Sequence, residues 1–202
     1  MIKRYNIILF IFLNINISYA DNFSEEKEFL KNFTEDAINI ISDQNTNVDQ
    51  KELLISDHVL KAFDTNKISQ AVLGSKTWSS ITKVQKKRFL EIFKKYISTR
   101  YMKNLVQYIS PNTKIRIDNA ENSGKSNQFI KITSTVYDEK TEGLSAEINW
   151  YIVNDVELKI FNAQIEGAHM VIIFREQIQT ILSNNSDFEL FLNNLENLNT
   201  NL

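Results

Sequence analysis

The sequence predicts an α+β fold in which N-terminal helices precede a curved antiparallel β-meander of about four strands, and C-terminal helices then cover one sheet face around an apolar pocket. Two changes in apolar periodicity support this order. Apolar side chains recur at helical spacing up to Tyr108, alternate with polar ones from residue 113 to Ile165, and return to helical spacing after Gly167. A chain of 202 residues that is 43% hydrophobic is long enough for one domain with a sizeable core.

The first twenty residues have the pattern of a secretory signal peptide. Two basic residues precede a short apolar run, and Ser18 and Ala20 place small side chains where a signal peptidase cleaves. The run is too short for a comfortable membrane span, which makes a retained anchor the less favoured alternative. We therefore expect residues 1–20 to be a cleavable signal peptide and residues 21–202 to form a single exported domain.

Composition excludes several classes of function. The net charge is −2, so the chain has no basic excess of the kind that binds nucleic acid. There is no cysteine, which rules out disulfides, a thiol nucleophile and a thiolate metal site. The stability of this exported chain must therefore come from packing.

Helices are predicted throughout the segment before the sheet. The first has an apolar stripe at helical spacing that includes Phe29, Phe33, Ala37 and Ile41. Shorter helices follow and end near Gly74, a residue type that favours a helix C-terminus. These helices provide apolar faces that must be buried against another layer.

A long helix is predicted after a capping box at Thr82–Gln85, and Pro111 blocks its continuation. Its aromatic stripe contains Phe93, Tyr96 and Ile97. Such a stripe is either ordinary core or the wall of a ligand pocket, and the spacing alone favours core.

Alternating apolar residues predict the strands and the face that each strand turns inward. In the second strand this face carries Ile130, Ile132, Ser134 and Val136, and in the third it carries Leu144, Ala146, Ile148, Trp150 and Ile152. A last long strand is predicted to start at Val156. Its apolar phase slips by one residue at Phe161, which predicts a β-bulge that bends the strand.

The chain after the last long strand raises the question of what an unbroken apolar block is buried against. Gly167 permits a sharp turn, and Met170–Phe174 is apolar on every side, which predicts a helix start inside the protein. Val171 and Phe174 are expected to face the sheet. Arg175 is expected at a pocket mouth or in an internal ion pair, and the ion pair is favoured because unpaired buried charge is costly.

Side chains that carry catalytic chemistry are sparse. Neither of the two histidines, His58 and His169, has a neighbour at metal-ligand spacing, and no nucleophile elbow or phosphate-binding glycine loop is present. No catalytic residue, metal site or cofactor is therefore predicted. The positive signal is the excess of apolar side chains, which suits either a large core or a pocket for an apolar ligand.

Several motifs, taken together, resemble one known family. They are Leu73-Gly74, Trp78, Thr82, Gln85, the aromatic spacing from Phe89 to Tyr96, Trp150, Asp155-Val156, Ile165-Glu166-Gly167, Phe174–Ile178 and Ile181-Leu182. In this order and spacing the chain resembles the MlaC-type family, also called the toluene-tolerance auxiliary family. It departs from the family at Phe174–Ile178, where the family usually has Tyr-Arg-Ser-Gln-Phe.

The resemblance implies a non-enzymatic periplasmic carrier without a cofactor. Such carriers hold phospholipid acyl chains between sheet and helices. They shuttle lipid between an outer-membrane lipoprotein complex and an inner-membrane ABC transporter with a substrate-binding ring, which maintains outer-membrane lipid asymmetry.

On this reading, the pocket wall is formed by apolar residues of the sheet and the helices. The candidate ligand-binding residues are Phe93, Tyr96, Ile97, Ile132, Val136, Leu144, Ala146, Ile148, Trp150, Val171 and Phe174. Three alternatives stay open: a carrier for another apolar lipid such as a hopanoid, a small α+β enzyme that uses His58 or His169, and a structural or adaptor protein with a filled core.

Overall fold

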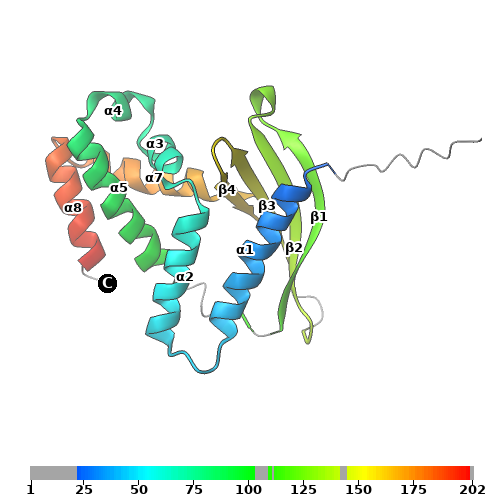
Figure 1. Cartoon of the computed structure of the whole chain (residues 1–202). Helices are drawn as coiled ribbons and strands as arrows, with labels where there is room; N and C mark the ends of the chain where they lie inside the picture. Colours follow the sequence, from blue (N-terminus) through cyan, green and yellow to red (C-terminus); the bar gives the residue numbers. More distant parts are fainter. Residues whose placement is uncertain (1–21, 103–108, 111, 142–144, 201–202) are drawn as a thin grey trace, which may run out of the picture.

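The chain folds into one antiparallel sheet with helices before and after it (Figure 1), as shown by a computed structural model that describes residues 22–102, 109–110, 112–141 and 145–200. The helices are α1 (Ser24–Ser42), α2 (Val48–Ala62), α3 (Thr65–Leu73), α4 (Ser75–Ser80), α5 (Lys83–Ile97), α7 (Met170–Ser183) and α8 (Phe188–Thr200). The strands are β1 (Thr113–Ser123), β2 (Phe129–Asp138), β3 (Ser145–Asn154), β4 (Leu158–Ile165) and β5 (Ala168–His169). The predicted α+β order is confirmed, and the short β5 adds a fifth strand.

The strands follow one another in the sheet in chain order, so the sheet is the predicted meander. Helix α1 crosses one face of the sheet, and α3, α5 and α8 lie farther from it (Figure 1). Helix α8 packs against α5. The predicted signal peptide lies outside the described residues.

Strand pairing brings the predicted inward faces together. Ile132 pairs with Trp150, Ser134 with Ile148, and Val136 with Ala146. Directly paired residues lie on the same sheet face, so the alternation in β2 and β3 predicted this face correctly.

The predicted bulge in β4 is confirmed. Tyr151 of β3 pairs with Asn162 and the next residue, Ile152, pairs with Ile160, which leaves Phe161 as the extra residue. The predicted start of this strand at Val156, however, was wrong, because β4 begins at Leu158. Val156 lies in the turn between β3 and β4 and is 99% exposed, because the turn extends to the residue before Leu158.

The turn after β4 has the geometry that Gly167 suggested. Glu166 and Gly167 both have positive φ, and Ile165 pairs directly with Ala168. Two central residues with positive φ make a two-residue type I′ hairpin, which reverses the chain tightly into β5 and then α7.

The predicted capping box is also present. Thr82 and Gln85 hydrogen-bond each other's backbone N–H groups at the start of α5. Helix α5 then continues into a π-helical turn, η1 (Ser98–Met102), and the rest of the predicted long helix lies outside the described residues. A second short element, η2 (Lys125–Asn127), lies in the β1–β2 connection.

Buried side chains form two hydrophobic clusters. One consists mainly of helical residues, such as Phe89 and Phe93 of α5 and Phe191 of α8. The other joins the inner sheet face to Leu30 and Phe33 of α1. The partly buried residues Val59, Phe63 and Met170 contact both clusters, so the two layers meet at these residues.

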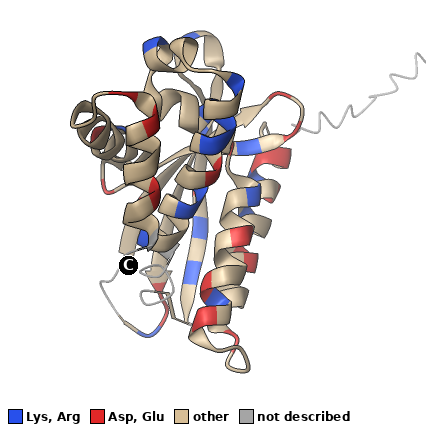
Figure 2. Ribbon diagram, turned by 90° about the vertical axis from the view of Figure 1, so that its left-hand side faces the viewer, with Lys and Arg blue, Asp and Glu red and all other residues tan. Residues whose placement is uncertain are grey.

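The surface carries both signs of charge. The chain contains 23 basic and 25 acidic residues, and both kinds lie along the side seen in Figure 2. Among the described residues, none of the helices combines the length and apolar character that a membrane span requires.

Candidate functional site

A cavity of about 350 Å³ lies where the two hydrophobic layers meet. The helices and their ends contribute Phe33, Val59, Leu60, Phe63, Thr65, Ile68, Ile97, Tyr101, Met170, Val171 and Phe174, and strands β3 and β4 contribute Ile148, Trp150, Phe161, Asn162, Ala163 and Ile165. The wall is almost entirely apolar. The cavity exists because the helical cluster and the sheet cluster are joined by a few partly buried residues rather than by continuous packing.

Of the eleven candidate wall residues, five line this cavity: Ile97, Ile148, Trp150, Val171 and Phe174. Phe93, Tyr96 and Ile132 are buried in the core and are not among the lining residues. Val136 and Ala146 pair with each other farther along the sheet, and Leu144 lies outside the described residues. The ligand-binding role of these residues stays a prediction.

Part of the wall was missed because it comes from the first two helices. Phe33 of α1 was recognised only as part of a helical stripe. No sequence pattern marked the residues from α2 and its C-terminal end as part of a pocket wall, namely Val59, Leu60 and Phe63. A helical stripe shows that a face is buried but not which surface it meets. The phase slip at Phe161 was the one sequence feature that marked β4 as unusual, and this bulge lies in the wall.

The apolar start of α7 is only partly buried. Phe174 is 7% exposed and lines the cavity, as does Val171, but Ile172 is 52% exposed. The prediction that the whole Met170–Phe174 block lies inside was therefore wrong. Successive helical residues point in directions about 100° apart, so one turn of α7 cannot turn every side chain toward the sheet.

The few polar groups in the wall bond to the protein itself. The Trp150 Nε1–H donates to the hydroxyl of Ser134 at 2.9 Å, and that buried hydroxyl donates to the Ile148 carbonyl at 3.3 Å. Asn162 accepts from the Val171 backbone N–H at 3.1 Å and its amide lies 2.7 Å from His169 Nδ1. These groups are already hydrogen-bonded, which leaves the cavity surface suited to hydrocarbon rather than to a polar ligand.

Two tyrosines beside the cavity share one partner on α7. The hydroxyls of Tyr96 and Tyr101 donate to Gln177 Oε1 at 3.0 and 2.8 Å. Burial raises the pKa of Tyr96, so its hydroxyl keeps the proton that it donates. These two hydrogen bonds connect α5 and η1 to α7 next to the cavity.

Arg175 has a different partner from the one expected. It is exposed, and its Nη1 donates to the Ala71 carbonyl at 3.1 Å. Among the described residues it forms no ion pair within 4.0 Å. Ala71 lies in the last turn of α3, where free carbonyls carry the negative end of the helix dipole, so a cation is favourable there.

Gly74 follows directly after α3 and leaves room for this guanidinium. A Cβ at Gly74 would lie 3.3 Å from Arg175 Nη2. The conformation of Gly74, with φ +77°, also favours glycine. Arg175 therefore joins α7 to the end of α3.

Neither histidine has the environment of a catalytic base. His58 Nε2 lies 2.8 Å from the Phe33 carbonyl, and its ring stacks on Phe33. His169 bonds to the amide of Asn162 rather than to a carboxylate. Neither residue lines the cavity, and the described residues contain no group of three or more His, Cys, Asp or Glu able to hold a metal ion. The enzyme hypothesis gains no support from these contacts.

Comparisons with known proteins agree with this architecture. The family model described as MlaC protein matches residues 31–197 of the chain. Among solved structures, the chain is similar to the phospholipid-binding protein from Ralstonia solanacearum, determined in complex with a phospholipid, with a TM-score of 0.72 and 17% sequence identity. The match covers 86% of this chain and 96% of that one, and at this identity it shows a shared fold. A comparison with curated proteins gave no match.

Proposed function

The chain belongs to the MlaC family, and on this basis we propose that it is a periplasmic carrier that binds the acyl chains of a phospholipid in the cavity between sheet and helices. The observation that carries the proposal is the almost wholly apolar wall of that cavity. The Ralstonia solanacearum protein of the same fold holds a phospholipid, which supports this class of ligand.

The physical reason for such a carrier is the cost of exposing hydrocarbon to water. Each buried methylene is worth roughly 0.8 kcal/mol, so transfer of free acyl chains through an aqueous compartment is strongly unfavourable. A cavity of about 350 Å³ lies within the range of ligand pockets. Its apolar wall replaces water around a chain without requiring further hydrogen bonds.

The proposed wall for the acyl chains combines predicted and newly found residues. Ile148 and Trp150 come from the sheet, and Val171 and Phe174 come from α7. Phe33 of α1 lies across from the sheet, with its ring 5.9 Å from that of Trp150. Together these residues supply aromatic and aliphatic surface from three directions.

The wider transport role follows from the family resemblance. In this role the N-terminal signal peptide directs export of a single mature domain. The carrier then moves lipid between an outer-membrane lipoprotein complex and an inner-membrane ABC transporter, and so maintains outer-membrane lipid asymmetry. No catalytic step or cofactor belongs to this function.

Lipid analysis of the protein purified without detergent tests the proposal. Native mass spectrometry is expected to show a bound mass that extraction identifies as phospholipid. Protein stripped of lipid is expected to take up phospholipid again from vesicles. A protein that carries no lipid and takes up none contradicts the proposed function, whereas a bound hopanoid instead of phospholipid would reassign the ligand.

A further inference from the structure

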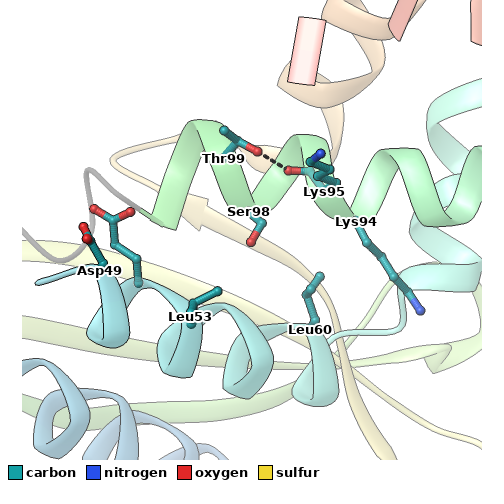
Figure 3. Close-up of a pocket in the computed structure, with 8 residues that line it drawn as sticks. Asp49, Leu53, Leu60, Lys94, Lys95, Ser98 and Thr99 are labelled. Carbon is teal, nitrogen blue, oxygen red and sulfur yellow. Dashed lines mark hydrogen bonds between the residues drawn. The ribbon is translucent and has the colours of Figure 1, made fainter. Parts of the chain in front are cut away.

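A second hollow, of about 480 Å³, lies on the surface between α2 and the end of α5 (Figure 3). We call it the α2–α5 groove. Its lining includes Asp49, Glu52 and Leu60 of α2, and Lys94 and Lys95 of α5. Leu60 also lines the apolar cavity, so this one side chain belongs to both hollows. The groove and the cavity are therefore neighbours, with Leu60 between them.

The chemistry of the groove changes along its length. Figure 3 shows Leu60 and Lys94 at one end and Asp49 at the other. Leu60 follows Asp49 by eleven residues, which is about 16 Å along a helix. Glu52 lies one turn from Asp49 on the same helix face. The exposed Leu53 also lines the groove, so the end at Leu60 is apolar and cationic and the far end is anionic.

The charges in this groove are available to a ligand. Within the described part of the chain, Asp49, Glu52, Lys94 and Lys95 form no ion pair within 4.0 Å and no side-chain hydrogen bond. The two hydroxyls in the groove already have partners within the protein. The Ser98 hydroxyl bonds to that of the buried Ser56, and the Thr99 hydroxyl donates to the Lys95 carbonyl at 2.7 Å. The charged side chains are therefore the groups in the groove that can bind a ligand.

A neighbouring groove that shares Leu60, Phe63 and Thr65 with the cavity wall is less suited to binding charge. Its Lys67 is paired with Asp64 at 3.4 Å and with Asp155. Its Lys159 is paired with Glu157 at 3.1 Å. A ligand would have to break these pairs, whereas the α2–α5 groove requires no such exchange.

We propose that the α2–α5 groove binds the headgroup of a zwitterionic, amine-bearing phospholipid. The phosphate lies at Lys94 and Lys95, the ammonium lies at Asp49 and Glu52, and the acyl chains pass Leu60 into the cavity. Lysine binds phosphate as a point charge, and carboxylates are the matching partners of an ammonium. This assignment rests on the proposed function and adds a headgroup site to it.

The order of charges also predicts lipid selectivity. A zwitterionic headgroup presents glycerol, phosphate and ammonium in sequence, which matches a groove that is apolar and cationic at Leu60 and anionic at its far end. An anionic headgroup without an amine leaves Asp49 and Glu52 unmatched and meets like charge. The protein is therefore expected to prefer phosphatidylethanolamine to phosphatidylglycerol.

Competition between these two lipids tests the assignment. The full mature chain, stripped of lipid, is incubated with vesicles that contain equal amounts of phosphatidylethanolamine and phosphatidylglycerol, and the bound lipid is extracted and quantified by mass spectrometry. The wild type is expected to be enriched in phosphatidylethanolamine. The variant Asp49→Asn/Glu52→Gln is expected to lose this enrichment, and Lys94→Gln/Lys95→Gln to bind about three- to fivefold less of both lipids, as is typical for solvent-exposed charge contacts.

A double variant on the same helix provides the matched control. Lys83→Gln/Lys87→Gln removes the same charge from exposed positions of α5 outside the groove, and it is expected to load both lipids like the wild type. An unchanged lipid ratio in the acidic variant overturns the ammonium site, and unchanged loading in the lysine variant overturns the phosphate site. A wild type that takes up neither lipid contradicts the proposed function itself, so the two failures are distinguishable.

Discussion

Asn162 of the bulged strand β4 caps helix α7, because its Oδ1 accepts a hydrogen bond of 3.1 Å from the backbone N–H of Val171. Adjacent strand residues normally point to opposite faces. The bulge at Phe161 disturbs this alternation, so that Phe161, Asn162 and Ala163 all line the cavity. One irregularity in the strand thus places a polar side chain at the start of a helix that otherwise has no side-chain cap.

Replacement of this capping residue is expected to destabilise the protein. Asn162→Ala leaves the Val171 N–H without its acceptor in a partly buried position, which costs about 1–2 kcal/mol. The free energy of unfolding, measured in urea, checks the value. Asn66→Ala, which removes an exposed side chain from α3, is the control, and an equal loss in both variants would contradict the capping role.

The two tryptophans are expected to report differently on a bound acyl chain. Trp150 lines the cavity, whereas Trp78 of α4 is not among the lining residues and lies against Lys86. Phospholipid with brominated acyl chains is therefore expected to quench the fluorescence of the Trp78→Phe variant, which retains Trp150. The Trp150→Phe variant is the control, and stronger quenching of its remaining tryptophan would place the chains elsewhere.

Filling the cavity is expected to prevent lipid uptake. Val171→Trp adds a large side chain within the cavity wall, whereas Ile172→Trp adds the same side chain at the next residue, which is 52% exposed. We expect loading from phospholipid vesicles to fall at least about tenfold only in the first variant, because the added ring occupies volume that the chains need. Circular dichroism checks that both variants fold. Equal loading by the two folded variants would contradict the assignment of this cavity.

Gly167 is expected to be required for its backbone conformation alone. Its φ is +84°, and a Cβ built at this position has no neighbour within 4 Å. Gly167→Ala is therefore expected to lower the free energy of unfolding by about 1–2 kcal/mol through strain without a clash. Gly167→Asn is the comparison, since asparagine tolerates this conformation better. Equal stability losses in thermal unfolding would speak against backbone strain as the cause.

Asp118 in β1 is expected to contribute to the loss of stability in acid. Its carboxylate accepts hydrogen bonds from Thr135 and Arg116, each 2.6 Å long, and these bonds lower the pKa of Asp118 below its ordinary value of 3.8. A lowered pKa stabilises the folded state above the unfolded pKa, and this stabilisation is lost as pH falls below about 4.

The measurement compares Asp118→Asn with the wild type by urea unfolding at about pH 6 and about pH 3. The variant is expected to lose less stability over this interval, because it has no carboxylate to protonate. Asp36→Asn, at an exposed position of α1, controls for the removal of a charge. A variant that loses as much stability as the wild type would exclude a contribution from Asp118.

Short-range patterns in the sequence predicted most of the architecture. Alternation in β2 and β3 identified the paired inner faces, the phase slip at Phe161 identified the bulge, and Thr82–Gln85 identified the start of α5. These features depend on neighbours a few residues apart, so the local sequence is sufficient to specify them. Val156 was misplaced because alternation continues into a turn without a change in residue type.

The cavity itself was decided by tertiary structure. Ile132 and Trp150 share a face and pair directly, yet Trp150 lines the cavity and Ile132 is fully buried in the core. The sequence marks both as inward-facing in the same way. Whether an apolar side chain meets another side chain or open space depends on the helices that cross the sheet, and these are distant in the chain.

The same distinction between local sequence pattern and tertiary packing applies to Arg175 of α7 and to Leu60. The sequence by itself determined that Arg175 follows an apolar block, but only the fold placed its guanidinium at the Ala71 carbonyl and Leu60 between cavity and groove. Periodicity determines which residues are buried, because it reflects the geometry of one helix or strand. Partners and open volume arise from how separate elements pack, and this packing depends on contacts between residues far apart in the sequence.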